Sequence, residues 1–180
     1  MIFTETALAG AFVIALEKLE DERGYFARSF GAREFAGHGL ESRFVQCGIS
    51  FNRRRGTLRG LHYQAAPHAQ AKLVRCSRGR AFDVIVDLRA GSPGYARWFA
   101  SELAAAAPRL LYIPAGFAHG FQTLEDDTEL FYQMSQDYDP AAERGIRWND
   151  PRLGIDWPSA ESRVISARDA ALPALDNERE

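Results

Sequence analysis

The sequence has few of the features that mark secreted, membrane-spanning or nucleic-acid-binding proteins. It has only two cysteines, Cys47 and Cys76, far apart in the chain, which favours a reduced, cytoplasmic protein over a disulfide framework but does not exclude a single bridge. No segment reaches the ~20 apolar residues that cross a bilayer, and the N-terminus lacks the basic region of a signal peptide. The formal net charge of -2 gives no reason to expect a nucleic-acid or membrane partner.

Helical periodicity, internal repeats and linker-like segments are also scarce. The sequence predicts helical turns only at residues 32–36 and 166–172. A chain of 180 residues that is 46% hydrophobic is long enough to bury one core, so we expect one domain over residues 1–180. The polar residues 176–180 are expected to fray.

The dominant pattern is an alternation of side chains with a period of two. It is clearest in residues 80–89, where Phe82, Val84, Val86 and Leu88 alternate with a second set of residues. Similar runs at residues 109–113, 117–124 and 128–134 are separated by turns rich in glycine, proline and aspartate. Many short strands with regular turns predict an all-β sandwich or barrel.

Two of these strand-like segments carry residues suited to acid–base chemistry. In residues 56–64, His62 follows Gly60, and a glycine within a strand often marks a bulge or a close approach to a ligand. In residues 128–134, alternation places Tyr132 with Leu130 and Met134 on one face, which we expect to point into the barrel. Either residue alone is more often structural than catalytic, so neither establishes a function.

Five segments resemble the dTDP-4-dehydrorhamnose 3,5-epimerase family in order and spacing. The resemblance implies a double-stranded β-helix, the cupin or jelly-roll barrel, with short peripheral helices. It also implies a homodimer that exchanges its N-terminal arms, with no metal and no organic cofactor. The segments are DERGYFARSF (21–30), GTLRGLHYQ (56–64), KLVRCSRGRAFDVIVDLRAGSP (72–93), IPAGFAHGFQTL (113–124) and YDPAAERGIRWNDPRLGIDWP (138–158).

Enzymes of this family epimerise a nucleotide-linked 4-keto-6-deoxy sugar on the route to rhamnose-type deoxysugars. The C4 ketone acidifies the C–H bonds at C3 and C5, so a base can form an enolate and an acid can return a proton to the opposite face. The resemblance implies that His62 is the base, Asp169 the carboxylate that orients it, and Tyr132 the acid. It places Lys72 beside the C4 oxygen, where an ammonium would stabilise the enolate.

The resemblance also implies a set of substrate-binding residues. Strict alternation would put Arg59 on the face opposite His62, so its role requires a bulge at Gly60 or an approach from the partner chain. The implied binding residues are Arg23, Phe26, Arg28, Gln46, Arg59, His119, Tyr138, Glu143 and Arg168.

Two departures from the family pattern leave the nucleotide open. Arg28 stands where the family usually carries a glutamate that reads thymine, and Gly48 stands where it carries an amide near the phosphates. Mono-epimerases acting at C3 or C5, and CDP- or GDP-linked substrates, therefore remain alternatives.

Two further classes of protein remain as alternatives. One is a metal-dependent cupin, which could use His62 and His119 with Glu125 or Glu129 as ligands. Against it, the usual cupin His-x-His pair is absent, because Gln64 stands two residues after His62. The other alternative is a non-catalytic sugar-nucleotide-binding barrel.

Overall fold

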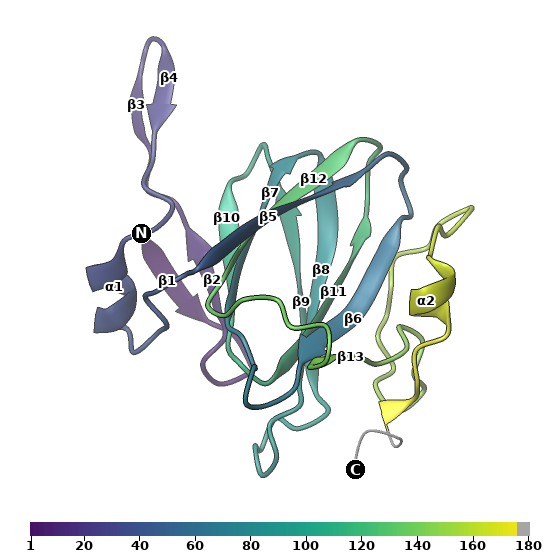
Figure 1. Ribbon diagram of the computed structural model, residues 1–180. Coiled ribbons are helices and arrows are strands. Elements are labelled where there is room, and N and C mark those ends of the chain that lie inside the picture. The colour runs from purple at the N-terminus through teal and green to yellow at the C-terminus, as the bar shows by residue number, and fades with distance from the viewer. Residues whose placement is uncertain (176–180) are drawn as a thin grey trace.

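The computed structural model, described here for residues 1–175, is built almost entirely from antiparallel strands (Figure 1). Residues 176–180, for which fraying was predicted, lie outside the described residues. One sheet has the order β1 (Ile2–Glu5), β2 (Phe12–Ala15), β10 (Arg109–Ile113), β7 (Lys72–Arg78), β12 (Thr128–Met134) and β5 (Gln46–Asn52). The second sheet has the order β13 (Glu143–Gly145), β6 (Leu58–Gln64), β11 (Phe117–Thr123), β8 (Arg80–Asp87) and β9 (Trp98–Ala104).

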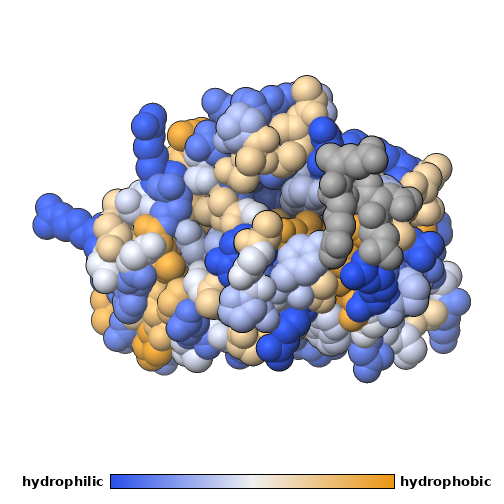
Figure 2. All heavy atoms as spheres, turned by 90° about the horizontal axis from the view of Figure 1, so that it is seen from below, coloured by the Kyte–Doolittle hydropathy of each residue, from blue (hydrophilic) through white to orange (hydrophobic). Residues whose placement is uncertain are grey.

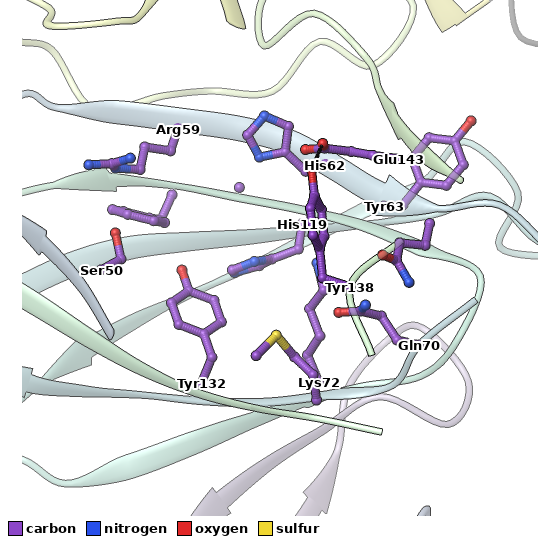
Figure 3. Close-up of a pocket in the computed structure, with 14 residues that line it drawn as sticks. Ser50, Arg59, His62, Tyr63, Gln70, Lys72, His119, Tyr132, Tyr138 and Glu143 are labelled. Carbon is purple, nitrogen blue, oxygen red and sulfur yellow. Dashed lines mark hydrogen bonds between the residues drawn. The ribbon is translucent and has the colours of Figure 1, made fainter. Parts of the chain in front are cut away.

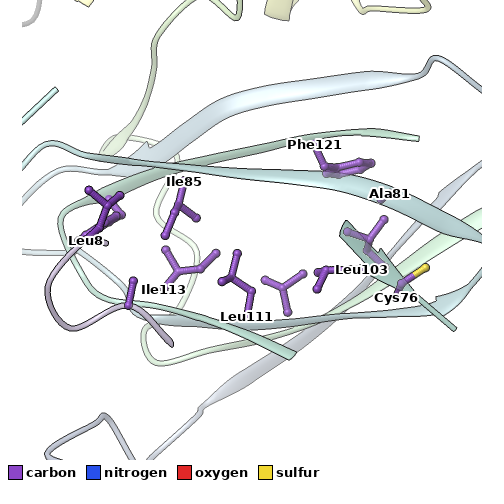
Figure 4. Close-up of a cluster of buried hydrophobic side chains, with 12 residues drawn as sticks. Leu8, Cys76, Ala81, Ile85, Leu103, Leu111, Ile113 and Phe121 are labelled. Atoms are coloured by element: carbon purple, nitrogen blue, oxygen red, sulfur yellow. The ribbon is translucent and has the colours of Figure 1, made fainter. Parts of the chain in front are cut away.

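The main core lies between the inner faces of these two sheets (Figure 4). Ile85 of β8, Leu111 of β10 and Leu130 of β12 are fully buried there. Each such side chain stabilises the fold by about 1.5–3 kcal/mol relative to an exposed position. The two sheets confirm the predicted all-β barrel.

Both faces of β8 are buried, which explains why apolar residues occur on both sides of this strand. Ala81 and Ile85 belong to the core between the sheets, whereas Val84 and Val86 pack outward against the C-terminal segment, including Trp157. The alternation of residues 80–89 therefore predicted the strand correctly, but burial does not distinguish its two faces.

Two short helices lie outside the barrel, as the sequence predicted. Helix α1 (Ala32–Gly37) places Phe35 against Ile14, Leu73 and Leu110 on the outer face of the first sheet. Helix α2 (Ala167–Ala170) lies beside β6 (Figure 1). None of the helices within residues 1–175 is long and apolar enough to cross a membrane.

A hairpin of β3 (Leu19–Asp21) and β4 (Gly24–Phe26) projects away from the barrel (Figure 1). Its apolar side chains are unusually exposed, at 70% for Leu19 and 66% for Phe26. The opposite end of the molecule, seen in Figure 2, instead intersperses hydrophilic and hydrophobic residues without one broad apolar patch.

Candidate active site

A cavity of about 210 Å³ opens between the two sheets (Figure 3). Its walls come from β6, β11 and β13 on one sheet and from β5, β7 and β12 on the other. The predicted site residues that line it are Arg59, His62, Lys72, His119, Tyr132, Tyr138 and Glu143.

A bulge in β6 brings Arg59 and His62 to the same cavity. The pairing of β6 with β11 is regular at His62 and at Arg59 but shifts register between these positions. As a result Leu58 and Leu61 both pack into the outer cluster, three residues apart, while Arg59 and His62 both face the cavity. The expected bulge at Gly60 is confirmed, and Arg59 reaches the cavity of its own chain.

His62 is held by a buried carboxylate from α2. Its Nε2 lies 3.0 Å from Oδ1 of Asp169, whose Oδ2 accepts a hydrogen bond from the Gly60 amide. Ser166 caps α2 by accepting from the Asp169 amide at 3.0 Å. In the tautomer with Nε2–H donating to Asp169, the lone pair is on Nδ1. Burial lowers the pKa of His62, against the opposing effect of Asp169, so the ring is neutral near pH 7 and can act as a base.

Tyr132 faces His62 from the opposite sheet. Leu130 joins the inner core and Met134 lines the cavity with Tyr132, which confirms the predicted inward face of β12. The Tyr132 ring meets the His119 ring edge-on, with 5.7 Å between centroids. Burial, and then the negative charge of Asp83, raise the pKa of Tyr132 well above its usual value. The phenol therefore keeps its proton and can donate it.

Lys72, the first residue of β7, supplies an ammonium to the same cavity. Burial lowers its pKa to about 8, while the charges of Asp83 and Glu143 oppose that shift. Lys72 is therefore mostly protonated at neutral pH and can stabilise a developing oxyanion.

Glu143 organises the mouth of the cavity. Its Oε2 accepts hydrogen bonds from the Tyr138 hydroxyl and the Arg168 guanidinium. Gln46 does not line the cavity, but its side-chain oxygen accepts from the Tyr138 amide at 2.9 Å. These contacts place Arg168 and Gln46 beside the cavity through Glu143 and Tyr138.

Sequence reasoning missed two buried polar residues that support the site. Asn52 accepts a hydrogen bond from Arg59 Nε at 2.8 Å, and Asp83 lies 2.8 Å from His119 Nε2 through its Oδ1. Both are at most 2% exposed. The available signal was a polar residue next to apolar ones in a strand. Such a residue, when buried, needs a hydrogen-bond partner, so it points to a polar neighbour inside the barrel.

Three predicted binding residues lie away from the cavity of their own chain. Arg23 and Phe26 belong to the projecting hairpin, where Arg23 pairs with Asp21. Arg28 pairs with Glu34 of α1 at 3.2 Å. All three side chains are largely exposed.

The alternative metal site has its two histidines together, since His62 and His119 are paired in neighbouring strands, but lacks its carboxylate. Glu125 pairs with Arg80, and Glu129 accepts a hydrogen bond from Ser77, so neither joins His62. Within residues 1–175 no three His, Cys, Asp or Glu side chains form a group that could hold a metal ion.

Comparisons with known proteins agree with this geometry. Residues 5–177 match the family model described as dTDP-4-dehydrorhamnose 3,5-epimerase. A protein of that name from Sinorhizobium fredii is 42% identical over 175 residues, covering 97% of this chain and 90% of the relative.

Solved structures of similar proteins also match this chain over most of its length. The 3,5-epimerase RmlC from Legionella pneumophila in complex with dTDP-4-keto-L-rhamnose is 39% identical, with a TM-score of 0.92, covering 97% of this chain and 93% of that one. The 3'-monoepimerase ChmJ from Streptomyces bikiniensis in complex with dTDP-quinovose is 35% identical, with a TM-score of 0.88, covering 95% and 86%. The chain therefore belongs to the dTDP-4-dehydrorhamnose 3,5-epimerase family and has its cupin-like fold.

Proposed function

We propose that the protein is an epimerase that inverts C3, C5 or both in a nucleotide-linked 4-keto-6-deoxy sugar, as a step of deoxysugar biosynthesis. The observation that carries the proposal is the placement of a neutral imidazole and a protonated phenol on opposite walls of one cavity. His62 comes from one sheet and Tyr132 from the other (Figure 3). A sugar ring between them can lose a proton from one face and gain a proton on the other.

The reaction follows from the protonation states of the residues. His62 removes the proton from the carbon beside the C4 ketone, and Asp169 stabilises the imidazolium that forms. The electron pair moves to the C4 oxygen, whose charge the Lys72 ammonium stabilises. Tyr132 then protonates the carbon from the opposite face, which inverts its configuration and restores the C4 ketone. His62 afterwards releases its proton to solvent, and the Tyr132 phenolate takes up a proton from solvent, so both residues return to their starting forms.

The remaining cavity residues bind the substrate in this proposal. The Arg59 guanidinium, fixed by Asn52, binds the diphosphate, an anion that suits a charged donor, and His119 contacts the same group. Tyr138, Glu143 and Arg168 enclose the mouth of the cavity, and Gln46 fixes the backbone of Tyr138.

The nucleoside is bound by the partner subunit's hairpin in an arm-exchanged homodimer. Two observations support this part of the proposal. The β3–β4 hairpin that carries Arg23 and Phe26 projects away from the barrel (Figure 1), and both side chains are exposed. The outer face of β5 also exposes Ile49 at 66% and Phe51 at 43%, an apolar surface that a second copy would cover. The two cysteines, both free thiols, suit a cytoplasmic location.

The proposal is tested with dTDP-, CDP- and GDP-linked 4-keto-6-deoxyglucose in D₂O, by following the C3 and C5 protons by NMR. We expect deuterium at one or both carbons with at least one nucleotide, in protein stripped of metals by chelation. The carbon labelled distinguishes a 3,5-epimerase from a mono-epimerase. Protein that labels neither carbon of any substrate is not an epimerase of this class, and activity that requires added Fe²⁺ or Zn²⁺ favours the metal-dependent alternative.

A further inference from the structure

The segment between β12 and β13 crosses from one sheet to the other beside the cavity. It comprises residues 135–142 and carries Tyr138, which lines the cavity (Figure 3). Its two ends are tied to the barrel by backbone hydrogen bonds at Ser135 and Ala142. The middle of the segment, residues 137–139, is held by two glutamine side chains, one from each sheet.

Gln64, the last residue of β6, holds this segment from the second sheet. Its Nε2 donates hydrogen bonds to the carbonyl oxygens of His68 at 2.8 Å and Asp137 at 3.2 Å, and its Oε1 accepts from the Asp139 amide at 2.8 Å. The side-chain amide has two N–H donors, so both are used by the backbone. Gln64 is 5% exposed although it lines the cavity. Its donors therefore serve the protein backbone rather than a substrate.

Gln46, the first residue of β5, holds the neighbouring residue from the first sheet. Its Oε1 accepts a hydrogen bond from the Tyr138 amide at 2.9 Å. Three consecutive residues, 137–139, are thus bonded in turn to Gln64, Gln46 and Gln64. With its backbone fixed from both sheets, Tyr138 directs its hydroxyl to Glu143 at the mouth of the cavity.

We propose that Gln64 is a positioning residue of the proposed epimerase, which together with Gln46 fixes Tyr138 at the mouth of the cavity. Neither glutamine transfers a proton. They order the segment before the substrate arrives, so that less conformational entropy is lost on binding. The proposal rests on the proposed function for its catalytic meaning, but the order of the segment can be measured without substrate.

Hydrogen exchange of the Tyr138 and Asp139 amides, followed by NMR in ¹⁵N-labelled protein, reports the two contacts separately. In Gln64→Leu the Asp139 amide should exchange at least ~5-fold faster, because a hydrogen bond between neutral groups stabilises the bonded form by about that factor. In Gln46→Leu the Tyr138 amide should exchange faster by a similar factor.

Replacement of each glutamine by glutamate separates their tasks. Gln46 gives the Tyr138 amide an acceptor, which a carboxylate also supplies, so Gln46→Glu should keep this amide protected. Gln64 also donates to two carbonyl oxygens, which a carboxylate would repel, so Gln64→Glu should free the Asp139 amide as Gln64→Leu does. Protection of the Asp139 amide that survives in both Gln64 variants would overturn the proposal.

The matched control is Gln122→Leu. Gln122 is 1% exposed and also holds a distant segment, because it donates to the Pro158 carbonyl at 2.9 Å and accepts from Arg163 Nε at 3.1 Å. This variant loses a buried amide of the same kind, yet it should leave kcat, KM and the exchange of the Tyr138 and Asp139 amides unchanged. Faster exchange of these two amides in Gln122→Leu, equal to that in the Gln64 variants, would reflect a general loss of stability and contradict the proposal.

The kinetic measurement uses the nucleotide-linked sugar that the wild type converts. Gln64→Leu should raise KM by at least ~5-fold and change kcat less, because the segment contacts the substrate but transfers no proton. An unchanged KM despite a freed Asp139 amide contradicts the positioning role. If no substrate is epimerised while the exchange pattern holds, the proposed function fails but the ordering of the segment by Gln64 stands.

The wild type tests the same contacts if the Gln64 variants fold poorly. Both Nε2 protons of Gln64 are bonded to carbonyl oxygens, so they should exchange at least ~5-fold more slowly than the side-chain protons of exposed Gln136. Gln46→Leu then supplies the KM measurement. Equal exchange of the two side-chain amides, or an unchanged KM in Gln46→Leu, would contradict the proposal.

Discussion

At the scale of single residues, burial lowers the pKa values of two basic groups in the cavity. His62 has a lowered pKa, so it loses its proton below its usual midpoint of about 6.5 and is a free base at pH 7. Lys72 has a pKa lowered to about 8, so it keeps its proton at pH 7 and loses it above pH 8. The active forms of both residues therefore coexist in a window around neutral pH.

This window predicts a bell-shaped dependence of kcat/KM on pH. Activity should fall on acidification below about pH 6.5, as His62 gains a proton, and again above about pH 8, as Lys72 loses its proton. In Lys72→Arg the alkaline limb should move well above pH 8, because a guanidinium keeps its charge. An alkaline limb that stays near pH 8 in this variant would assign it to another group.

The family resemblance implies a glutamate that reads thymine at the position of Arg28. A guanidinium cannot accept the N3–H of thymine, whereas the glutamate usual at this position can. We expect weak discrimination among dTDP, dUDP, CDP and GDP in calorimetric titrations, and a sharper preference for dTDP in Arg28→Glu. A wild-type preference for dTDP above ~100-fold that Arg28→Glu leaves unaltered would show that Arg28 does not read the base.

At the scale of elements, the bulge of β6 depends on two glycines where the strand crosses β11. Gly60 has a φ of +117°, and a Cβ there would lie 2.6 Å from the Cα of Gly120. Gly60→Ala should therefore displace both Arg59 and His62, lowering kcat by more than ~10-fold and reducing the melting temperature.

The control for this prediction is Gly91→Ala. Gly91 has a positive φ of +76°, but a Cβ there meets nothing within 4 Å. The Gly91→Ala variant should be less stable, because alanine is strained at a positive φ, and should keep the wild-type kcat. Equal kcat values in the two variants would mean that the close crossing of β6 and β11 does not position the site.

Sequence reasoning predicted those elements whose pattern is local. The alternation of residues 80–89 and the inward face of Tyr132 follow from the period of a strand. The contact of Asp83 with His119 was not predicted, because both faces of β8 are buried and alternation alone does not say which face points between the sheets. The sequence did not decide whether Arg59 reaches the site through a bulge at Gly60 or from the partner chain. The register shift that decides it depends on β11, about 60 residues away in the sequence.

At the scale of the whole molecule, arm exchange predicts that two inactive variants complement each other. In a mixed dimer of His62→Ala and Phe26→Ala, one site combines an intact His62 with an intact hairpin. After unfolding and refolding together, the mixture should recover about a quarter of wild-type activity, since half of the dimers are mixed and each has one working site. The control is each variant refolded alone. A mixture no more active than its components would place the hairpin over the cavity of its own chain or outside the site.

The most direct measurement for the whole account is proton exchange in D₂O by the wild type, Tyr132→Phe and His62→Ala, followed by NMR at C3 and C5. The wild type should incorporate deuterium with inversion. Tyr132→Phe retains the base but lacks the acid, so it should exchange protons with retained configuration while inversion slows by roughly 10²–10⁴-fold. His62→Ala should do neither. Inversion by Tyr132→Phe at the wild-type rate, or exchange by His62→Ala, would contradict the assignment of acid and base to opposite walls of the cavity.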